Sequence, residues 1–129
     1  MHRSKLSTFV IDCQGGDVDA AARFWSRALG RAIAAPSPEE GDSYRALEQP
    51  DDQVMVLVQR VDHPSRIHLD IESDDIEAEV QRLEKLGARR IEKIRTWWVL
   101  EAPTGQRFCV IRPQRGPLGA SASEWPSDR

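Results

Sequence analysis

Cysteine is scarce in this sequence, and long apolar runs are absent. Cys13 and Cys109 are its two cysteines, and neither lies in a CxxC or similar spacing, so no cysteine-based zinc site or disulfide framework is predicted. We expect both to be free thiols in a reducing compartment. The longest apolar run, residues 54–58, is far too short to span a membrane. The first residues lack a signal-peptide core, so the predicted location is cytoplasmic.

An excess of positive charge is also lacking. The formal net charge is −3, and the arginines are scattered along the chain rather than massed in one segment. We therefore expect neither nucleic acid nor a membrane as a partner. With 129 residues, of which 40% are hydrophobic, the chain suits one globular domain with a core of its own.

Two amphipathic helices stand out among short β-type runs. Apolar residues recur at helical spacing over 17–30 and 76–87. An aspartate (Asp17, and Asp74 or Asp75) can cap the start of each helix, and Gly30 or Gly87 can end it. The predicted strands cover residues 8–13, 31–34, 43–48, 53–61, 66–72, 88–95, 96–101 and 106–113. The order is therefore strand, helix and three strands, twice over.

This order divides the chain into parts. Residues 1–6 are expected to form an N-terminal arm, and residues 7–113 the folded domain, with modules of about 7–61 and 66–113. Residues 114–129 are rich in Gly, Pro, Ser and Ala, which predicts a flexible tail.

The two modules also resemble each other residue by residue. Leu29-Gly30 and Leu86-Gly87 end the two helices at an offset of 57. Residues 47–53 match 100–106 at an offset of 53, and residues 10–13 match 68–71 at an offset of 58. Short α/β motifs can match by chance, but three registers in the correct order favour a true internal repeat.

Three segments resemble the glyoxalase/bleomycin-resistance/dioxygenase superfamily, and in particular its glyoxalase-like subgroup. They are FWSRALG at 24–30, similar to the family's first-helix ending, RIHLD at 66–70, and VLEAPTGQRFCV at 99–110. The resemblance implies an α+β fold in which two βαβββ modules form a curled mixed sheet around a cup-shaped pocket, with helices on the convex face. It also implies a homodimer, because family members usually pair.

Strand alternation predicts which side chains face such a cup. Phe9, Ile11 and Cys13 form an apolar set that should meet a helix, so Val10 and Asp12 should face the cup. The same reasoning assigns to the cup Tyr44, Val54, Val56, Val58, Arg66, His68, Asp70, Trp97, Val99, Arg107, Cys109 and Ile111.

The resemblance also gives a test for metal binding. Metal-dependent relatives place two histidines and two glutamates at four strand positions, which here correspond to Val10, Val56, His68 and Cys109. Valine has no lone pair for a cation, so we expect no metal and no other cofactor. Cys109 is then a packed thiol. The alternative is a reduced zinc site in which Asp12 or Asp70 helps His68 and Cys109.

Polar residues in the cup suggest acid–base chemistry. His68 and Asp70 lie two residues apart on one strand face, and Asp12 is the repeat mate of Asp70. A carboxylate beside an imidazole fixes its tautomer and suits it to act as a general base, which makes His68, Asp70 and Asp12 the candidate catalytic residues. The alternative is that these residues and Arg66 form a satisfied structural network.

Aromatic residues suggest binding of a flat, partly apolar small molecule. Tyr44 and Trp97 are repeat mates on the cup side, although core or dimer packing would explain them as well. The candidate ligand-binding residues are Trp97, Tyr44, Arg66, Val10, Val56, Val99 and Cys109. The predicted function is metal-independent binding of a small molecule. The alternative is a glyoxalase-like enzyme, a lyase or isomerase, that uses His68 and Asp70 as acid and base or a reduced metal site.

Overall fold

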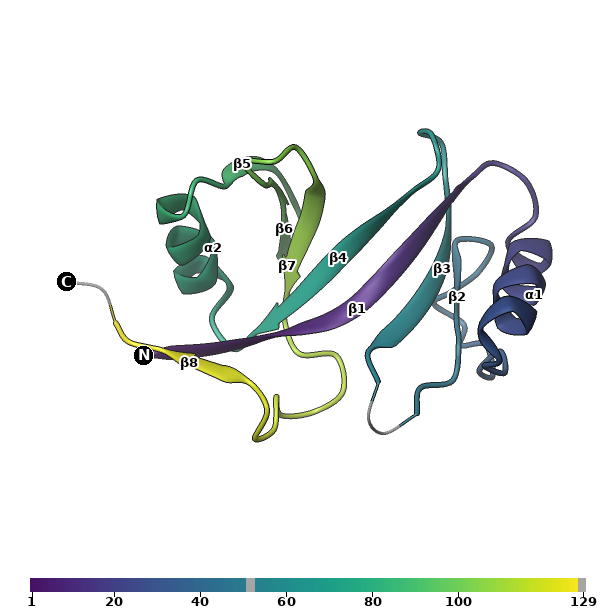
Figure 1. The fold of residues 1–129 in the computed structure, drawn as a ribbon, viewed down its shortest axis with the longest axis horizontal. Helices are drawn as coiled ribbons and strands as arrows, with labels where there is room; N and C mark the ends of the chain where they lie inside the picture. The colour runs from purple at the N-terminus through teal and green to yellow at the C-terminus, as the bar shows by residue number, and fades with distance from the viewer. Residues whose placement is uncertain (51–52, 128–129) are drawn as a thin grey trace. The chain divides into compact units, whose positions relative to one another are not determined.

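The computed structural model describes residues 1–50 and 53–127, in which the chain forms two compact units (Figure 1). Thr8–His68 make up the first, here called the N-terminal unit. Met1–Ser7 and Leu69–Arg129 make up the second, the C-terminal unit. No helix in the described part of the chain is long and apolar enough to cross a membrane.

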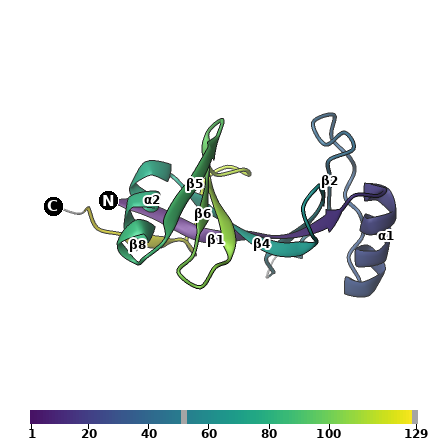
Figure 2. The same ribbon diagram turned by 90° about the horizontal axis from the view of Figure 1, so that it is seen from above.

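The N-terminal unit packs one helix on a small mixed sheet. It holds most of β1 (His2–Gln14), then α1 (Val18–Leu29), β2 (Tyr44–Ala46) and β3 (Met55–Val61). β3 lies between β1, to which it is parallel, and β2, to which it is antiparallel. α1 lies alongside β2 and β3 (Figure 2). The core consists of Ile11, Leu47, Val56 and Val58, with Cys13, Ala21, Trp25 and Ile33 packed against it.

The C-terminal unit repeats this plan with two more strands. After β4 (Arg66–Ser73) come α2 (Ile76–Lys85), β5 (Arg89–Ile94), β6 (Trp97–Glu101), β7 (Arg107–Ile111) and β8 (Ser123–Trp125). β4 pairs parallel with β7, while β7, β6 and β5 follow one another as an antiparallel meander. The core consists of Val80, Leu100, Phe108 and Val110, with Ile71, Ile76, Leu83, Ala88, Trp98 and Ala102 packed against it.

The predicted helix boundaries agree with local chemistry. The side chain of Asp17 accepts a hydrogen bond from the backbone of Asp19, and that of Asp75 accepts one from Ala78. Gly30 ends α1 in the left-handed region, at a φ of 69°, where a residue without Cβ is favoured. The predicted α+β class with a mixed sheet is confirmed. Of the strand expected at 31–34, a single bridge from Ile33 to Leu47 remains.

Both ends of the chain differ from the expected arm and flexible tail. β1 begins at His2, and His2–Ser4 pair with β8, so residues 2–6 belong to a strand. Trp125 explains why the tail is ordered here: its indole Nε1 donates a hydrogen bond to Ser4 Oγ at 2.9 Å, and the Arg82 guanidinium lies 3.7 Å from its ring centroid.

The expected orientation of β3 is wrong by one residue. Val56 and Val58, predicted to face the cup, lie in the core with Ile11. The parallel register pairs Phe9 with Val56 and Ile11 with Val58, so these residues take the side of α1. The side away from α1 is occupied by Leu57 and Gln59. Asp51 and Asp52, in the repeated segment 47–53, lie outside the described residues.

Candidate functional site

Each unit has a sheet face turned away from its helix, which we call the distal face. In the N-terminal unit, β1 contributes Val10 and Asp12 to this face. The register pairs Asp12 with Gln59 of β3, and Gln59 with Tyr44 of β2, so all three side chains belong to the same face. Val10 pairs likewise with Leu57. The structure therefore places Val10, Asp12 and Tyr44 on one face, as the sequence predicts.

Asp12 is the centre of a polar cluster on the N-terminal distal face. Only 2% of the residue is exposed. Its Oδ2 lies 2.7 Å from His68 Nδ1, 3.7 Å from Arg66 Nε and 3.9 Å from His63 Nε2. Only the first distance is that of a hydrogen bond. A buried carboxylate thus holds one imidazole directly and has two further cationic or potentially cationic groups nearby.

The hydrogen bond that His68 donates to Asp12 assigns the roles of the two imidazole nitrogens. A carboxylate accepts, so Nδ1 carries the hydrogen and Nε2 carries the lone pair when the ring is neutral. The His68 side chain keeps 15% of its surface exposed, whereas the carboxylate behind it keeps 1%. An imidazole oriented from behind by a buried carboxylate can accept a proton at Nε2.

The second oxygen of Asp12 is unusual. Within residues 1–50 and 53–127, Oδ1 is buried and has no hydrogen-bond partner. Leaving a buried acceptor unsatisfied costs free energy, about 1–3 kcal/mol for an ordinary group. The cluster therefore retains hydrogen-bonding capacity that the protein itself does not use.

The distal face of the C-terminal unit carries the remaining candidates. Cys109 of β7 pairs with Asp70 of β4 and with Val99 of β6, so these three side chains share a face. Trp98 packs in the core beside α2, and its neighbour Trp97 therefore points the other way. The parity of β6 and β7 is as predicted.

Three residues near the candidates were not expected. Glu72, on the same face of β4 as Asp70, is 4% exposed and accepts a 2.5 Å hydrogen bond from Ser7 Oγ. His63 lies just beyond β3. It is far from Asp12 in the sequence, so the sequence does not indicate that the two residues are close in space. Gln59 was not predicted to face the cup, because the alternation of side chains along β3 was assigned one residue out of register. Of the two carboxylates expected beside His68, Asp12 lies within hydrogen-bond distance of its Nδ1, and a catalytic role for Asp70 remains a prediction.

The N-terminal unit does not fit the metal ligand set that the resemblance implies. Val10 has no donor atom, and Val56 is buried in the core, 7% exposed. The offset of 58 aligns Asp12 with Asp70. Gln59 pairs with Asp12, and Cys109 pairs with Asp70. Gln59 is therefore the residue of the N-terminal unit that corresponds to Cys109. An amide oxygen is a weaker ligand for zinc than carboxylate or thiolate. His68 Nδ1 is already bound by Asp12.

The two cysteines are both free thiols. Cys13 packs against the core on the side of α1, and burial together with the negative charge of Asp12 raises the pKa of its thiol. A raised pKa keeps the thiol protonated and unreactive near neutral pH.

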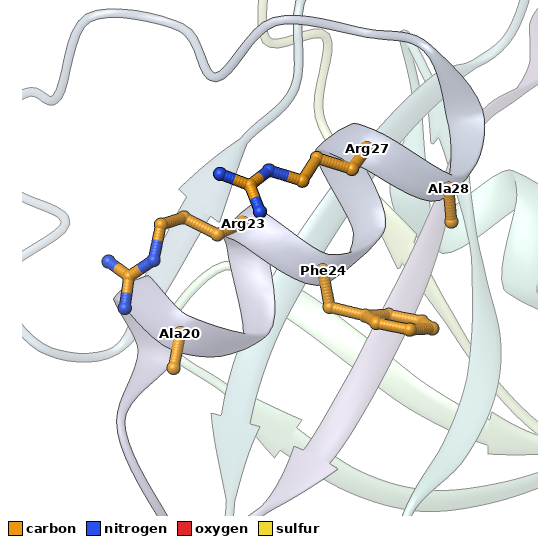
Figure 3. Close-up of a pocket in the computed structure, with 5 residues that line it drawn as sticks. All are labelled: Ala20, Arg23, Phe24, Arg27 and Ala28. Carbon is orange, nitrogen blue, oxygen red and sulfur yellow. The ribbon is translucent and has the colours of Figure 1, made fainter.

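A separate depression of about 550 Å³ lies on the outer surface of α1 (Figure 3). Figure 3 shows Arg23 and Arg27 extending to one side of the helix, while the ring of Phe24 extends to the other. Phe24 is 62% exposed, and Ala20 and Ala28 complete the lining. The depression contains no acid–base pair and lies on the side of β1 opposite to Asp12.

In the N-terminal unit β1 runs parallel to β3, and in the C-terminal unit β4 runs parallel to β7, a repeat that agrees with the resemblance to the glyoxalase/bleomycin-resistance/dioxygenase superfamily. A model of the Glyoxalase-like domain matches residues 8–111, and the chain belongs to this family. Comparison with curated proteins finds no match.

Solved structures share this fold at low sequence identity. A hypothetical protein from Bacillus halodurans C-125 superimposes with a TM-score of 0.63 at 15% identity, covering 90% of this chain and 99% of its own. Methylmalonyl-CoA epimerase from Mycobacterium tuberculosis gives 0.62 at 16%, with 85% and 88% covered. A Legionella pneumophila structure described as an NAD-dependent benzaldehyde dehydrogenase gives 0.59 at 8%, with 82% and 99% covered. Since these descriptions differ, the shared fold does not define an activity.

Proposed function

We propose that this protein binds a small molecule on the N-terminal distal face and transfers a proton to or from it with His68. The observation that carries the proposal is the 2.7 Å hydrogen bond between the buried Asp12 carboxylate and His68 Nδ1. Asp12 orients the imidazole and would stabilise the imidazolium that forms when Nε2 accepts a proton.

The simplest reaction that this pair supports is isomerisation through an enolate. His68 Nε2 accepts a proton from a carbon next to a carbonyl group, the C–H bond breaks, and its electron pair moves to the carbonyl oxygen. Return of a proton to the opposite face of that carbon, or to a neighbouring atom, completes the isomerisation, and no oxidant or other reactant is consumed. The M. tuberculosis neighbour is described as an epimerase, and epimerisation at a C–H carbon is chemistry of this kind.

No step of this proposal uses a metal ion, in keeping with the poor fit of the N-terminal residues to the expected ligand set. Tyr44 and Leu57 would supply apolar contact surface beside the acid–base pair, and Gln59 an amide that can orient a polar group. A cytoplasmic location and a homodimer remain predictions.

A second candidate is a binding protein that performs no reaction. It is favoured by Trp97 and Val99, which present an aromatic and an aliphatic side chain on the C-terminal distal face, where they can pack against a flat ligand.

Deuterium exchange tests the proposal. The protein in D₂O is incubated with a panel of oxo acids and acyl thioesters that includes methylmalonyl-CoA, and loss of the C–H signal is followed by proton NMR. We expect catalysed exchange with at least one compound. His68→Gln should slow it by roughly 10²–10⁴-fold, the usual contribution of a general base. Arg60→Gln is the control, because Arg60 is an exposed residue of β3 that pairs with Cys13 and belongs to the side of α1.

The tautomer of His68 gives a second readout that needs no substrate. Long-range ¹H–¹⁵N spectra of the neutral ring should show the hydrogen on Nδ1, and Asp12→Ala, which removes the acceptor, should disturb this state. Binding of panel compounds without any exchange would refute the enzyme and leave the binding protein in its place. Equal exchange rates in the wild type and His68→Gln would show that another residue is the base.

A further inference from the structure

Arg66 differs in its hydrogen bonding from most arginines of this protein that lie near an acceptor group. The guanidinium groups of Arg3, Arg31, Arg45, Arg82, Arg89, Arg90 and Arg107 all donate hydrogen bonds to protein acceptors. Arg66 donates none within the part of the chain that the structure describes. Its Nε lies 3.7 Å from Asp12 Oδ2, and its side chain is 46% exposed.

This guanidinium stands directly beside the proposed base. Arg66 and His68 are two residues apart on β4, so their side chains leave the same face of the strand. Both approach the same oxygen atom, Asp12 Oδ2. Arg66 Nε and His68 Nδ1 can therefore be separated by no more than the sum of their two distances to that atom.

We infer that the ligand carries a carboxylate group, bound by Arg66, within a few bonds of the atom that exchanges its proton with His68. The inference rests on the proposed function and names the substrate class of the same site. A guanidinium presents parallel N–H groups that match the two oxygens of a carboxylate, and such charge-assisted pairs are strong and directional.

The charge balance of the cluster is compatible with an anionic ligand. Asp12 contributes one negative charge, and Arg66 alone offsets it. His63 and His68 can each add a positive charge on protonation. A ligand carboxylate on the exposed side of Arg66 would be separated from the buried Asp12 by the guanidinium itself. The positive guanidinium would then lie between the two carboxylates, so the two negative charges would not be adjacent.

Phenylpyruvate and its methyl ester are suitable probes. They share a flat ring, a ketone and an exchangeable C–H, and they differ in the negative charge. Calorimetric titration of the wild type should show that the acid binds about tenfold or more tightly than the ester, which corresponds to one charge-assisted pair. The preference should weaken at high ionic strength, because Arg66 is partly exposed.

Variants of Arg66 test whether this residue causes the preference for the acid over the ester. Arg66→Gln should remove it, so that acid and ester bind equally, and Arg66→Lys should retain part of it. Arg60→Gln is the matched control: Arg60 is an exposed arginine of β3 that pairs with Cys13 and so belongs to the side of α1. This variant should keep the full preference.

The outcomes separate the inference from the proposed function. No preference for the acid in the wild type, including no binding of either probe, would overturn the inference, as would equal losses in Arg66→Gln and Arg60→Gln. An Arg66-dependent preference without any catalysed C–H exchange would uphold carboxylate recognition and refute proton transfer. Exchange that depends on His68 but is equally fast for acid and ester would uphold proton transfer and refute carboxylate recognition.

Discussion

Two buried carboxylates differ in how completely their oxygens are hydrogen-bonded: Glu79 in the C-terminal unit and Asp12 in the N-terminal unit. Glu79 is 0% exposed, and both of its oxygens are used. His2 Nε2 and Arg82 Nε each lie 2.8 Å from Oε1, and Arg82 contacts Oε2 at 2.8 Å. Asp12 concentrates its contacts on one oxygen and leaves the other without a partner among the described residues.

The difference separates a carboxylate that holds the fold from one that is available for chemistry. The saturated network of Glu79 ties α2 to the first residues of β1, and through Arg82 and Trp125 to β8. The unsaturated cluster of Asp12 has spare hydrogen-bonding capacity and an uncommitted Arg66. Full pairing is typical of structural networks, whereas incomplete pairing of a buried group calls for another explanation.

The largest expected effect concerns Glu79. Glu79→Ala would leave the Arg82 guanidinium and His2 without their shared acceptor, and breaking a buried ion pair in this way costs about 3–5 kcal/mol. Urea denaturation followed by circular dichroism measures the free energy of unfolding. Glu84→Ala, on the exposed side of the same helix, is the control. A loss below about 1 kcal/mol would contradict the structural role given to Glu79.

Asp12→Asn should cost much less stability. The substitution keeps the volume and leaves an amide oxygen that His68 Nδ1 can still bind, so we expect a change of about 1 kcal/mol in the free energy of unfolding. Proton exchange with a responsive substrate should nevertheless fall sharply. If this variant lost as much stability as Glu79→Ala, the two carboxylates would both be structural and the comparison would fail.

The stability contributed by Glu79 should depend on pH. Burial acts to raise its pKa, but hydrogen bonds from Arg82, His2 and Ser4 outweigh burial and hold the pKa below the usual value for a glutamate. A lowered pKa stabilises the fold above the unfolded-state value, and this contribution is lost as the pH falls through the folded-state value. Denaturation of wild type and Glu79→Gln between pH 7 and pH 3 should therefore show the smaller acid destabilisation in the variant.

The smallest effect is expected at the surface pair of Glu77 and Arg90. Hydrogen bonds from Arg90 and then Gln81 lower the pKa of Glu77 from 4.5 to about 2. The Glu77 side chain is 53% exposed, so solvent screens the pair, and Glu77→Gln should cost only about 0.3–0.5 kcal/mol at pH 7. That small difference should vanish as the pH falls from about 4.5 toward 2. Thermal unfolding over this range measures it, and a loss above 1 kcal/mol would be inconsistent with screening.

Sequence patterns predicted some features well for identifiable reasons. The helices follow from apolar spacing bounded by Asp17 and Gly30, or by Asp75 and Gly87, because capping is local chemistry. The parity of β1 follows from its alternation of Asp12 with Ile11 and Cys13. The parity of β3 could not be read, since residues 54–58 are all apolar and show no period of two.

The candidate site was anticipated only in part. Asp12, His68 and Arg66 were all identified as polar residues of one face. The sequence left open whether Asp12 or Asp70 would lie closer to His68, because a single sequence does not specify which residues of neighbouring strands face each other. In the structure Asp12 Oδ2 accepts the hydrogen bond from His68 Nδ1. His63 and Glu72 gave no signal of their own, since a histidine beside a proline and a glutamate in a strand are both ordinary at a surface.

The pairing of β8 with β1 bears on aggregation. Without β8, the backbone N–H and C=O groups of His2–Ser4 on that side would lie at an open sheet edge, and open edges recruit strands from other molecules. β8 is only a three-residue strand, held by the indole of Trp125 and the guanidinium of Arg82. The contacts of Trp125 and Arg82 thus help to keep this edge covered by β8.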